Sequence, residues 1–316
     1  MSPQDDVLDR CRVIIREGSK SFAQAAGLFD RETRAAAFLL YAWCRHCDDQ
    51  IDGEHLGYKN GAEACDDRGA RLAWLYDETR SVLRGEAPRD PVFAALQRVV
   101  TRYAIPERYP LELLEGFAMD VDGRRHPNLD DLFLYCYHVA GTVGLMMAHI
   151  MGVRDEWTLQ RAADLGIALQ MTNIARDVID DARSGRVYLP LCWLESAGVP
   201  AEGLADPAHR SALATVVRQL LAEADRYYHS AARGLSRLPF RSAWAVAVAR
   251  GVYREIGKTV LRRGDKAWDE RAIVPKHRKL AQVGRGLLVA CFTSSVGRLK
   301  SAPRPDDLWT KEPSLD

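Results

Sequence analysis

Two acidic stretches of the sequence carry side chains that could bind a divalent cation. The first is the run DDQID at residues 48–52, which ends an apolar stretch at residues 35–44. If this region is helical, Asp48 and Asp52 lie one turn apart on the same face, so their carboxylates converge. A bound cation would relieve the repulsion between these two like charges. Taken alone, this pattern is equally typical of a solvated helix end.

The second acidic stretch is QMTNIARDVIDD at residues 170–181. Its oxygen-bearing side chains recur at helical spacing and form one stripe: Gln170, Asn173, Asp177 and Asp181. Such a stripe on a mostly apolar helix needs partners, because buried carboxylates and amides are costly when unsatisfied. Hard oxygen ligands on two facing helices suit Mg²⁺, completed by phosphate oxygens of a substrate, with Mn²⁺ as an alternative. Zinc is disfavoured, since no His or Cys falls in register.

Groups that could bind phosphate stand close to both acidic stretches in the sequence. The run GSKS at residues 18–21 is expected at a helix start, where free amide groups favour anions, although most such runs are simple N-caps. Arg45 precedes the first acidic stretch, and Arg183 and Arg186 follow the second on a loop that contains glycine. Each arginine could bind diphosphate oxygens, and Arg183 could equally be a surface residue paired with an aspartate.

Helices must position these side chains, because apolar residues recur at three- and four-residue spacing along most of the chain and strand signals are sparse. The predicted fold class is therefore all-α, with Pro and Gly marking the breaks. The clearest predicted helices cover residues 32–52, 70–84, 91–103, 110–121, 157–181, 210–235 and 241–263. No linker or repeat divides the chain, so we expect one domain at residues 1–300 and a loose, Pro-containing tail at residues 301–316.

Composition excludes several functional classes. The 316 residues include 44 Lys and Arg against 43 Asp and Glu, so no overall field favours nucleic acid binding. The seven cysteines are scattered rather than arranged as a disulfide framework, and the CxxC of Cys44 and Cys47 is expected to be a pair of buried thiols. The acidic N-terminal stretch differs from a signal peptide. We therefore expect a cytoplasmic protein.

One segment is apolar enough to raise the question of a membrane span. Residues 132–153 contain no Asp, Glu, Lys or Arg, and this is the length of a bilayer-crossing helix. The Tyr and His residues inside it are poor lipid-facing side chains, and Gly141 and Gly144 favour a division into two short helices. We predict two helices buried in the core, with peripheral membrane association left open.

Four stretches of the sequence together resemble the bacterial phytoene synthases of the squalene and phytoene synthase family: YAWCRHCDDQID, EGFAMDV, YCYHVAGTVGLMMAHIMGV and QMTNIARDVIDDARSGRVYLP. The similarity extends from about residue 18 to about residue 268. It implies a single-domain α-helical isoprenoid synthase fold with a central cavity and an acidic motif on each of two opposed helices near the mouth. It also implies a prenyltransferase of carotenoid biosynthesis. Such an enzyme joins two molecules of geranylgeranyl diphosphate through prephytoene diphosphate and releases phytoene and diphosphate.

The resemblance further implies roles for individual residues. It places magnesium ligands at Asp48, Asp52, Asn173, Asp177 and Asp181. It places diphosphate contacts at Ser19, Ser21, Tyr41, Arg45, Gln170, Asn173 and Arg271. Two tyrosines, Tyr137 and Tyr253, fall at active-site positions of the family, and Tyr137 is predicted to be catalytic. The sequence departs from many relatives at Ala175 and Asp180, and neither is an expected ligand.

Other functions remain open at this stage. The nearest alternative is a squalene or dehydrosqualene synthase acting on farnesyl diphosphate, because spacing does not reveal the depth of the cavity. A head-to-tail prenyltransferase or terpene cyclase also uses acidic helices, but the asparagine-containing second motif favours the head-to-head family. A non-catalytic helical lipid carrier would give no reason for two carboxylate stripes. The expected partners are geranylgeranyl diphosphate and other enzymes of carotenoid synthesis.

Overall fold

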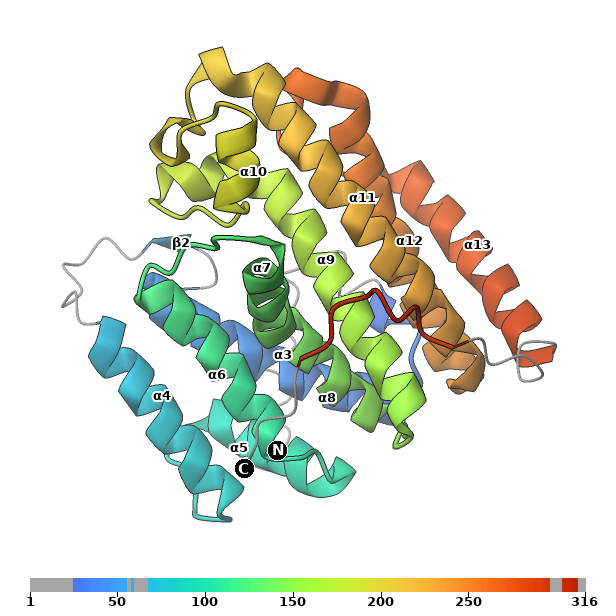
Figure 1. The fold of residues 1–316 in the computed structure, drawn as a ribbon. Helices are drawn as coiled ribbons and strands as arrows, with labels where there is room; N and C mark the ends of the chain where they lie inside the picture. Colours follow the sequence, from blue (N-terminus) through green and yellow to red (C-terminus); the bar gives the residue numbers. More distant parts are fainter. Residues whose placement is uncertain (1–24, 56–57, 60–67, 296–302, 312–316) are drawn as a thin grey trace.

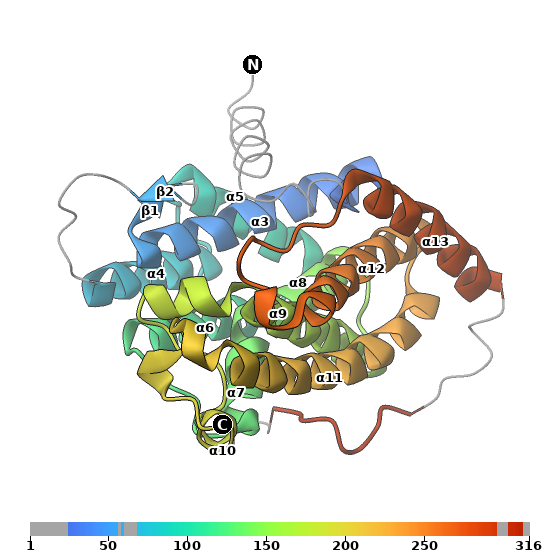
Figure 2. The same cartoon turned by 90° about the horizontal axis from the view of Figure 1, so that it is seen from above.

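Long α-helices form almost all of the computed structural model, which describes residues 25–55, 58–59, 68–295 and 303–311 (Figures 1 and 2). The first helices are α3 (Arg31–Asp52), α4 (Arg68–Leu83), α5 (Pro91–Tyr103), α6 (Arg108–Val121), α7 (Leu129–Cys136) and α8 (Thr142–Ile150). They are followed by α9 (Glu156–Arg183), α10 (Leu191–Ser196), α11 (Arg210–Gly234), α12 (Phe240–Arg263) and α13 (Lys276–Ser295). The prediction of an all-α fold is confirmed.

Short elements complete the described chain. Strands β1 (Glu54–His55) and β2 (Tyr58–Lys59) pair antiparallel, with Glu54 opposite Lys59. The 3₁₀ turns η2 (Ala201–Gly203) and η3 (Pro207–His209) lie between α10 and α11, while η4 (Leu235–Arg237) and η5 (Gly264–Lys266) flank α12. These pieces change the direction of the chain between the long helices.

Helix starts follow local capping chemistry. The side chain of Asp30 accepts a hydrogen bond from the Thr33 amide at the start of α3, and Asp90, Asn128 and Asp155 cap α5, α7 and α9 in the same way. These caps satisfy amide groups that have no partner within the helix. Each predicted helix agrees with an observed one to within a few residues.

Helix α9 lies among the other helices near the centre of the fold (Figure 2) and contributes side chains to two apolar clusters. One cluster gathers side chains from α3, α5, α6 and α8 around the fully buried Trp43. The other gathers side chains from α7, α9, α11 and α12 around the equally buried Tyr227. The long helix α9 therefore packs against both halves of the protein, and this position makes it the natural support for a central site.

The apolar segment Leu129–Ile150 is one continuous helical stretch, in which the π-helical turn η1 (Tyr137–Gly141) joins α7 to α8. The prediction of two helices broken by glycine is therefore wrong. Gly144 and Gly166 instead allow α8, η1 and α9 to touch, because an added Cβ would collide with the carbonyls of Ala162 and Ala140. Within the described residues this is the one helix long and apolar enough to cross a membrane, and 61% of its apolar window is buried inside the protein.

Gly166→Ala should destabilise the protein by about 1–3 kcal/mol, because the new methyl group enters the space of the Ala140 carbonyl. Thermal unfolding measures the effect. Gly284→Ala on α13 is the matched control, since no atom of the other described residues, its own helix backbone apart, lies within 4 Å of the added methyl group. There, alanine should be neutral or slightly stabilising. Equal melting temperatures for wild type and Gly166→Ala would refute the close contact.

The described part of the C-terminal segment, residues 303–311, packs against the helices, whereas a loose tail was expected from residue 301. Arg304 pairs with Asp164 at 2.8 Å, and Asp164 also accepts a 2.5 Å hydrogen bond from Ser230. The Trp309 ring lies beside the rings of Phe133 and Tyr137. A proline- and charge-rich composition suggested a solvated tail, but a buried ion pair, two aromatic contacts and further hydrogen bonds, such as that from the Trp309 amide to the Tyr227 hydroxyl, join the segment to the helices.

Arg304→Gln should lower the free energy of unfolding by about 3 kcal/mol, because it leaves the carboxylate of Asp164, only 1% exposed, without its cation. Asp307→Asn on the same segment is the control. It breaks only an exposed pair with Arg226 and should cost under about 1 kcal/mol. Chemical denaturation of both variants checks the difference, and similar losses would show that the segment contributes no buried charge pair.

Candidate active site

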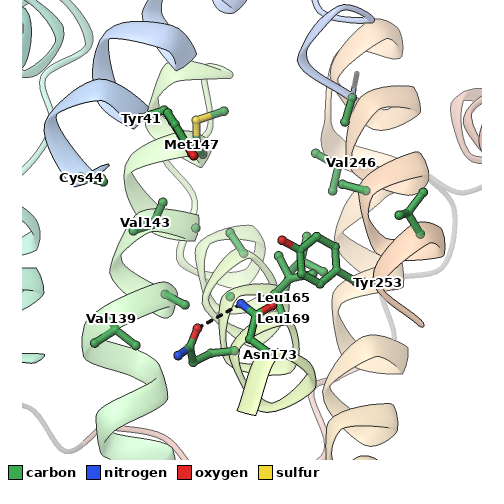
Figure 3. Close-up of a pocket in the computed structure, with 18 of the residues that line it drawn as sticks. Tyr41, Cys44, Val139, Val143, Met147, Leu165, Leu169, Asn173, Val246 and Tyr253 are labelled. Carbon is green, nitrogen blue, oxygen red and sulfur yellow. Dashed lines mark hydrogen bonds between the residues drawn. The ribbon is translucent and has the colours of Figure 1, made fainter. Parts of the chain in front are cut away.

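An elongated cavity of about 1020 Å³ runs along α9. Residues at helical spacing on one face of α9 line it, from Arg161 through Leu165, Leu169 and Asn173 to Asp177. At 1.5 Å per residue, the wall between Arg161 and Asp177 is about 24 Å long. Side chains from α3, α8 and α12 close the other sides, with Tyr41 and Met147 opposite Val246 and Tyr253 (Figure 3). The cavity is mostly apolar between its strongly charged end, at Asp177, and the buried Arg161 at the other end.

The first acidic pair lies at the end of α3, at the charged end of the cavity. Asp48 and Asp52 both line the cavity, and Arg45 donates to Asp48 at 3.0 Å from the preceding turn. The side chain of Asp48 is 42% exposed, and it lines the cavity. Burial, reinforced by the charge of Asp52, raises the pKa of Asp48 to about 7. The two carboxylates therefore repel each other where a cation would be favoured.

The second acidic pair lies near the end of α9 and lines the same cavity. Asp177 accepts two hydrogen bonds from Arg176, at 2.8 and 2.5 Å, and pairs with Arg271 at 3.3 Å. Burial and the charge of Asp177 raise the pKa of Asp181 to about 7. The two acidic stretches of the sequence thus meet at one cavity, as the family resemblance implied.

Arg186 connects the two acidic pairs. It follows α9 after the turn at Gly185, whose φ of +81° suits glycine, and its guanidinium donates to both oxygens of Asp52 on α3. Its charge also opposes the rise in the pKa of Asp181. Arg183, the other arginine named from the sequence, lies on the surface and pairs with the exposed Asp180 at 3.3 Å. Of these two loop arginines, Arg186 is the one that lines the cavity.

The oxygen atoms at this end of the cavity fit Mg²⁺. The side-chain oxygen of Asn173 is buried and has no hydrogen-bond partner among the described residues, while its amide nitrogen donates to Gln170 at 3.3 Å (Figure 3). Among the described residues, no three His, Cys, Asp or Glu side chains converge on one point. Each acidic pair supplies two carboxylates, which is the usual share for Mg²⁺ sites completed by water and phosphate oxygens. The unpartnered oxygen of Asn173 could serve as a further ligand.

Of the remaining predicted diphosphate contacts, some line the cavity and others lie outside the described residues. Tyr41, Arg45, Gln170 and Arg271 line the cavity, as does Tyr253. Burial raises the pKa of Tyr41 to about 12, so its hydroxyl stays protonated and can donate a hydrogen bond. Ser19 and Ser21 lie outside the described residues.

Tyr137 does not take the position predicted for it. It is absent from the cavity lining formed by the described residues, and its hydroxyl donates to Glu112 at 2.9 Å, with Lys311 above its ring. The π-helical turn that begins at Tyr137 lets the neighbouring Val139 and Ala140 face the cavity instead. Sequence spacing alone does not reveal such a turn, since it shifts which residues share a face.

Sequence reasoning missed three cavity residues that form one hydrogen-bonded group. Asp120 at the end of α6 accepts from Tyr135 at 3.0 Å and from Tyr188 at 2.8 Å, and all three line the cavity. Burial raises the pKa of Asp120, while the charge of Arg186 opposes that rise. The available signal was an aspartate inside the apolar run AMDV and a tyrosine two residues after Arg186.

Comparison with known proteins agrees with this geometry. The family model for squalene/phytoene synthase matches residues 15–278. The chain is 51% identical to a 15-cis-phytoene synthase from Enterobacter agglomerans, covering 93% of this chain and 98% of that protein. It is 49% identical to a 15-cis-phytoene synthase from Pantoea ananas, covering 93% and 94% of the two chains.

Solved structures show the same fold. A dehydrosqualene synthase in complex with a ligand superposes with a TM-score of 0.80 at 28% identity, covering 89% of this chain and 95% of that one. A squalene synthase from Alicyclobacillus acidocaldarius gives a TM-score of 0.72 at 25% identity, covering 82% and 94%. The resemblance noted in the sequence is thereby confirmed, and the chain belongs to the squalene/phytoene synthase family.

Proposed function

We propose that this protein is a phytoene synthase, a prenyltransferase that condenses two molecules of geranylgeranyl diphosphate head-to-head. Prephytoene diphosphate would be the intermediate, and phytoene and diphosphate the products. The observation that carries the proposal is the placement of two carboxylate pairs and several arginines at one end of a long apolar cavity. Relatives of about half identity over nearly the whole chain, named phytoene synthases, support the same activity.

The length of the cavity suits a twenty-carbon prenyl chain. Such a chain has a main chain of sixteen carbons, which would extend to about 19 Å at the spacing of extended covalent chains. The α9 wall between Arg161 and Asp177 measures about 24 Å by its helical rise, so the chain fits between the charged end and the buried arginine. A fifteen-carbon chain would also fit, and the choice of the longer substrate therefore rests on the relatives.

The residues at the charged end have distinct tasks in this reaction. Asp48, Asp52, Asp177 and Asp181, with Asn173, would hold Mg²⁺, for which Mn²⁺ is an alternative. The metal supplies positive charge that stabilises the departing diphosphate. Arg45, Arg186 and Arg271 line the same end and can donate to diphosphate oxygens once these replace their aspartate partners.

The apolar walls would protect the allylic carbocation that remains. Side chains such as Val143, Met147, Leu165 and Val246 exclude water, which would otherwise add to the cation. The rings of Tyr41 and Tyr253 can attract the cation across the cavity. The same walls would hold the cyclopropyl intermediate in place for the second ionisation. The departing diphosphate can accept the final proton.

The cellular setting is also a proposal. Cys44, Cys47, Cys136, Cys192 and Cys291 are all free thiols, which supports a reducing cytoplasm. Burial raises the pKa of Cys44 to about 12 and that of Cys47 well above its ordinary value, so both thiols stay protonated and a metal or redox role is disfavoured. Other enzymes of carotenoid synthesis would be partners.

A dehydrosqualene or squalene synthase is the second candidate, favoured by the fold match to a dehydrosqualene synthase. Purified protein incubated with geranylgeranyl or farnesyl diphosphate, with and without Mg²⁺, separates the two by the mass of the extracted hydrocarbon. We expect phytoene from the twenty-carbon substrate and its loss with EDTA. If a thirty-carbon hydrocarbon is the sole product, the substrate assignment is wrong. If neither substrate gives a product, the proposal that the protein is an enzyme is wrong.

Asp181→Asn should lower kcat at least about a hundredfold, because it removes one negative charge from the proposed metal site. Asp180→Asn is the matched control, since this neighbouring carboxylate is 69% exposed and pairs with Arg183 on the surface. Its kcat should stay within about twofold of wild type. Steady-state rates with Mg²⁺ check both variants, and equal losses would contradict the assignment of Asp181.

Tyr135→Phe should lower kcat at least about tenfold, because the hydroxyl both lines the cavity and holds Asp120. Tyr137→Phe should have little effect on kcat, since its hydroxyl contacts Glu112 outside the cavity. The same rate assay compares the two variants under identical conditions. The reverse order of effects would restore the role predicted for Tyr137 from the sequence.

A further inference from the structure

Helix α13 presents an apolar stripe to solvent. Leu280 and Leu288 are each 71% exposed and Phe292 is 65% exposed, and their spacing of eight and four residues places them on one face. Ile273, just before the helix, is 68% exposed. A row of large exposed apolar side chains on one helix is unusual for a protein surface that meets only water. The stripe therefore indicates a surface that is covered in use.

The same surface is strongly basic. Helix α13 contains four Lys and Arg residues and no acid, although the whole chain is nearly neutral. Glu255, on α12, is paired with Arg278 and Arg262. Lys276 and Arg285 on α13 are exposed. A basic helix with an apolar face complements an anionic phospholipid surface.

The position of α13 connects this surface to the cavity. The helix lies at the outer edge of the protein beside α12 (Figures 1 and 2). Its first half also forms part of the cavity wall, through Lys276, Lys279, Leu280 and Val283. One helix thus contacts both the apolar cavity and the solvent. Leu280 belongs to both surfaces, so the two apolar regions are continuous.

We propose that α13 docks this protein on an anionic phospholipid bilayer. The stripe of Leu280, Leu288 and Phe292 enters the headgroup region, while Lys276 and Arg285 contact lipid phosphates. This arrangement brings the cavity wall to the membrane surface. The consequence for catalysis rests on the proposed function: a hydrocarbon product that is insoluble in water leaves beside α13 and enters the bilayer directly.

Vesicle flotation of the full-length protein tests the docking without any substrate, so its result is independent of the enzymatic proposal. The protein should float with phosphatidylcholine vesicles that contain phosphatidylglycerol, and far less with phosphatidylcholine alone. Binding should weaken when salt rises from about 0.1 M to about 0.5 M, because screening shortens the reach of the basic residues. Absence of binding to the anionic vesicles would overturn the proposal.

Two sets of variants locate the surface. Leu288→Gln with Phe292→Gln should reduce partitioning onto anionic vesicles at least about tenfold, since two buried apolar contacts are lost. Arg285→Gln should weaken it by about fivefold. Arg98→Gln, which changes an exposed arginine on α5, is the matched control and should have no effect.

Other results would identify a different occupant of the surface. Leu288 and Phe292 do not contribute to the cavity wall formed by the described residues, so activity in detergent should be unchanged in the double variant. Circular dichroism melting should also match wild type. Unaltered flotation of the double variant would place membrane binding elsewhere. If the wild-type protein is a dimer in solution, and the double variant is a monomer with unchanged flotation, then α13 contacts a second copy of the chain and not the membrane.

Discussion

The repulsion within each of two carboxylate pairs at one end of an apolar cavity is the constraint on which the rest of the structure depends. Asp48 and Asp52 face Asp177 and Asp181 in surroundings that raise the pKa of one member of each pair to about 7. Arginines from several elements pair with these carboxylates and offset the repulsion. Arg186, which follows α9, pairs with Asp52 on α3. A metal-bound diphosphate would relieve the same repulsion. The negative charge of the aspartates therefore lowers the stability of the free protein and also binds the substrate through the metal.

Close helix packing holds the two carboxylate pairs in position relative to each other. The glycines Gly144 and Gly166 bring α8, η1 and α9 to backbone contact, and both glycines lie in the cavity wall. The buried pair of Asp164 and Arg304 attaches the C-terminal segment to the other side of α9. The helix that carries Asp177 and Asp181 is thus held on both sides, and a small shift would move both carboxylates relative to those of α3.

Much of this arrangement could be predicted from the sequence, because it depends on periodicity. The spacing of Gln170, Asn173, Asp177 and Asp181 predicted one face of one helix, and that face lines the cavity. Tyr137 could not be placed in the same way, since the π-helical turn shifts the face by a residue. Asp120 was missed because its partners, Tyr135 and Tyr188, come from distant parts of the chain. The packing of Arg304 depends on a single buried partner, which composition does not reveal.

The most direct test of the account is a crystal structure with Mg²⁺ and a prenyl thiodiphosphate that cannot ionise readily. We predict metal ions coordinated by Asp48 or Asp52 on one side and by Asp177 or Asp181 on the other. The diphosphate should displace the aspartate partners of Arg45 and Arg186, and the prenyl chain should extend along α9 toward Arg161. Diphosphate bound elsewhere, or bound without contact to either acidic pair, would contradict the account.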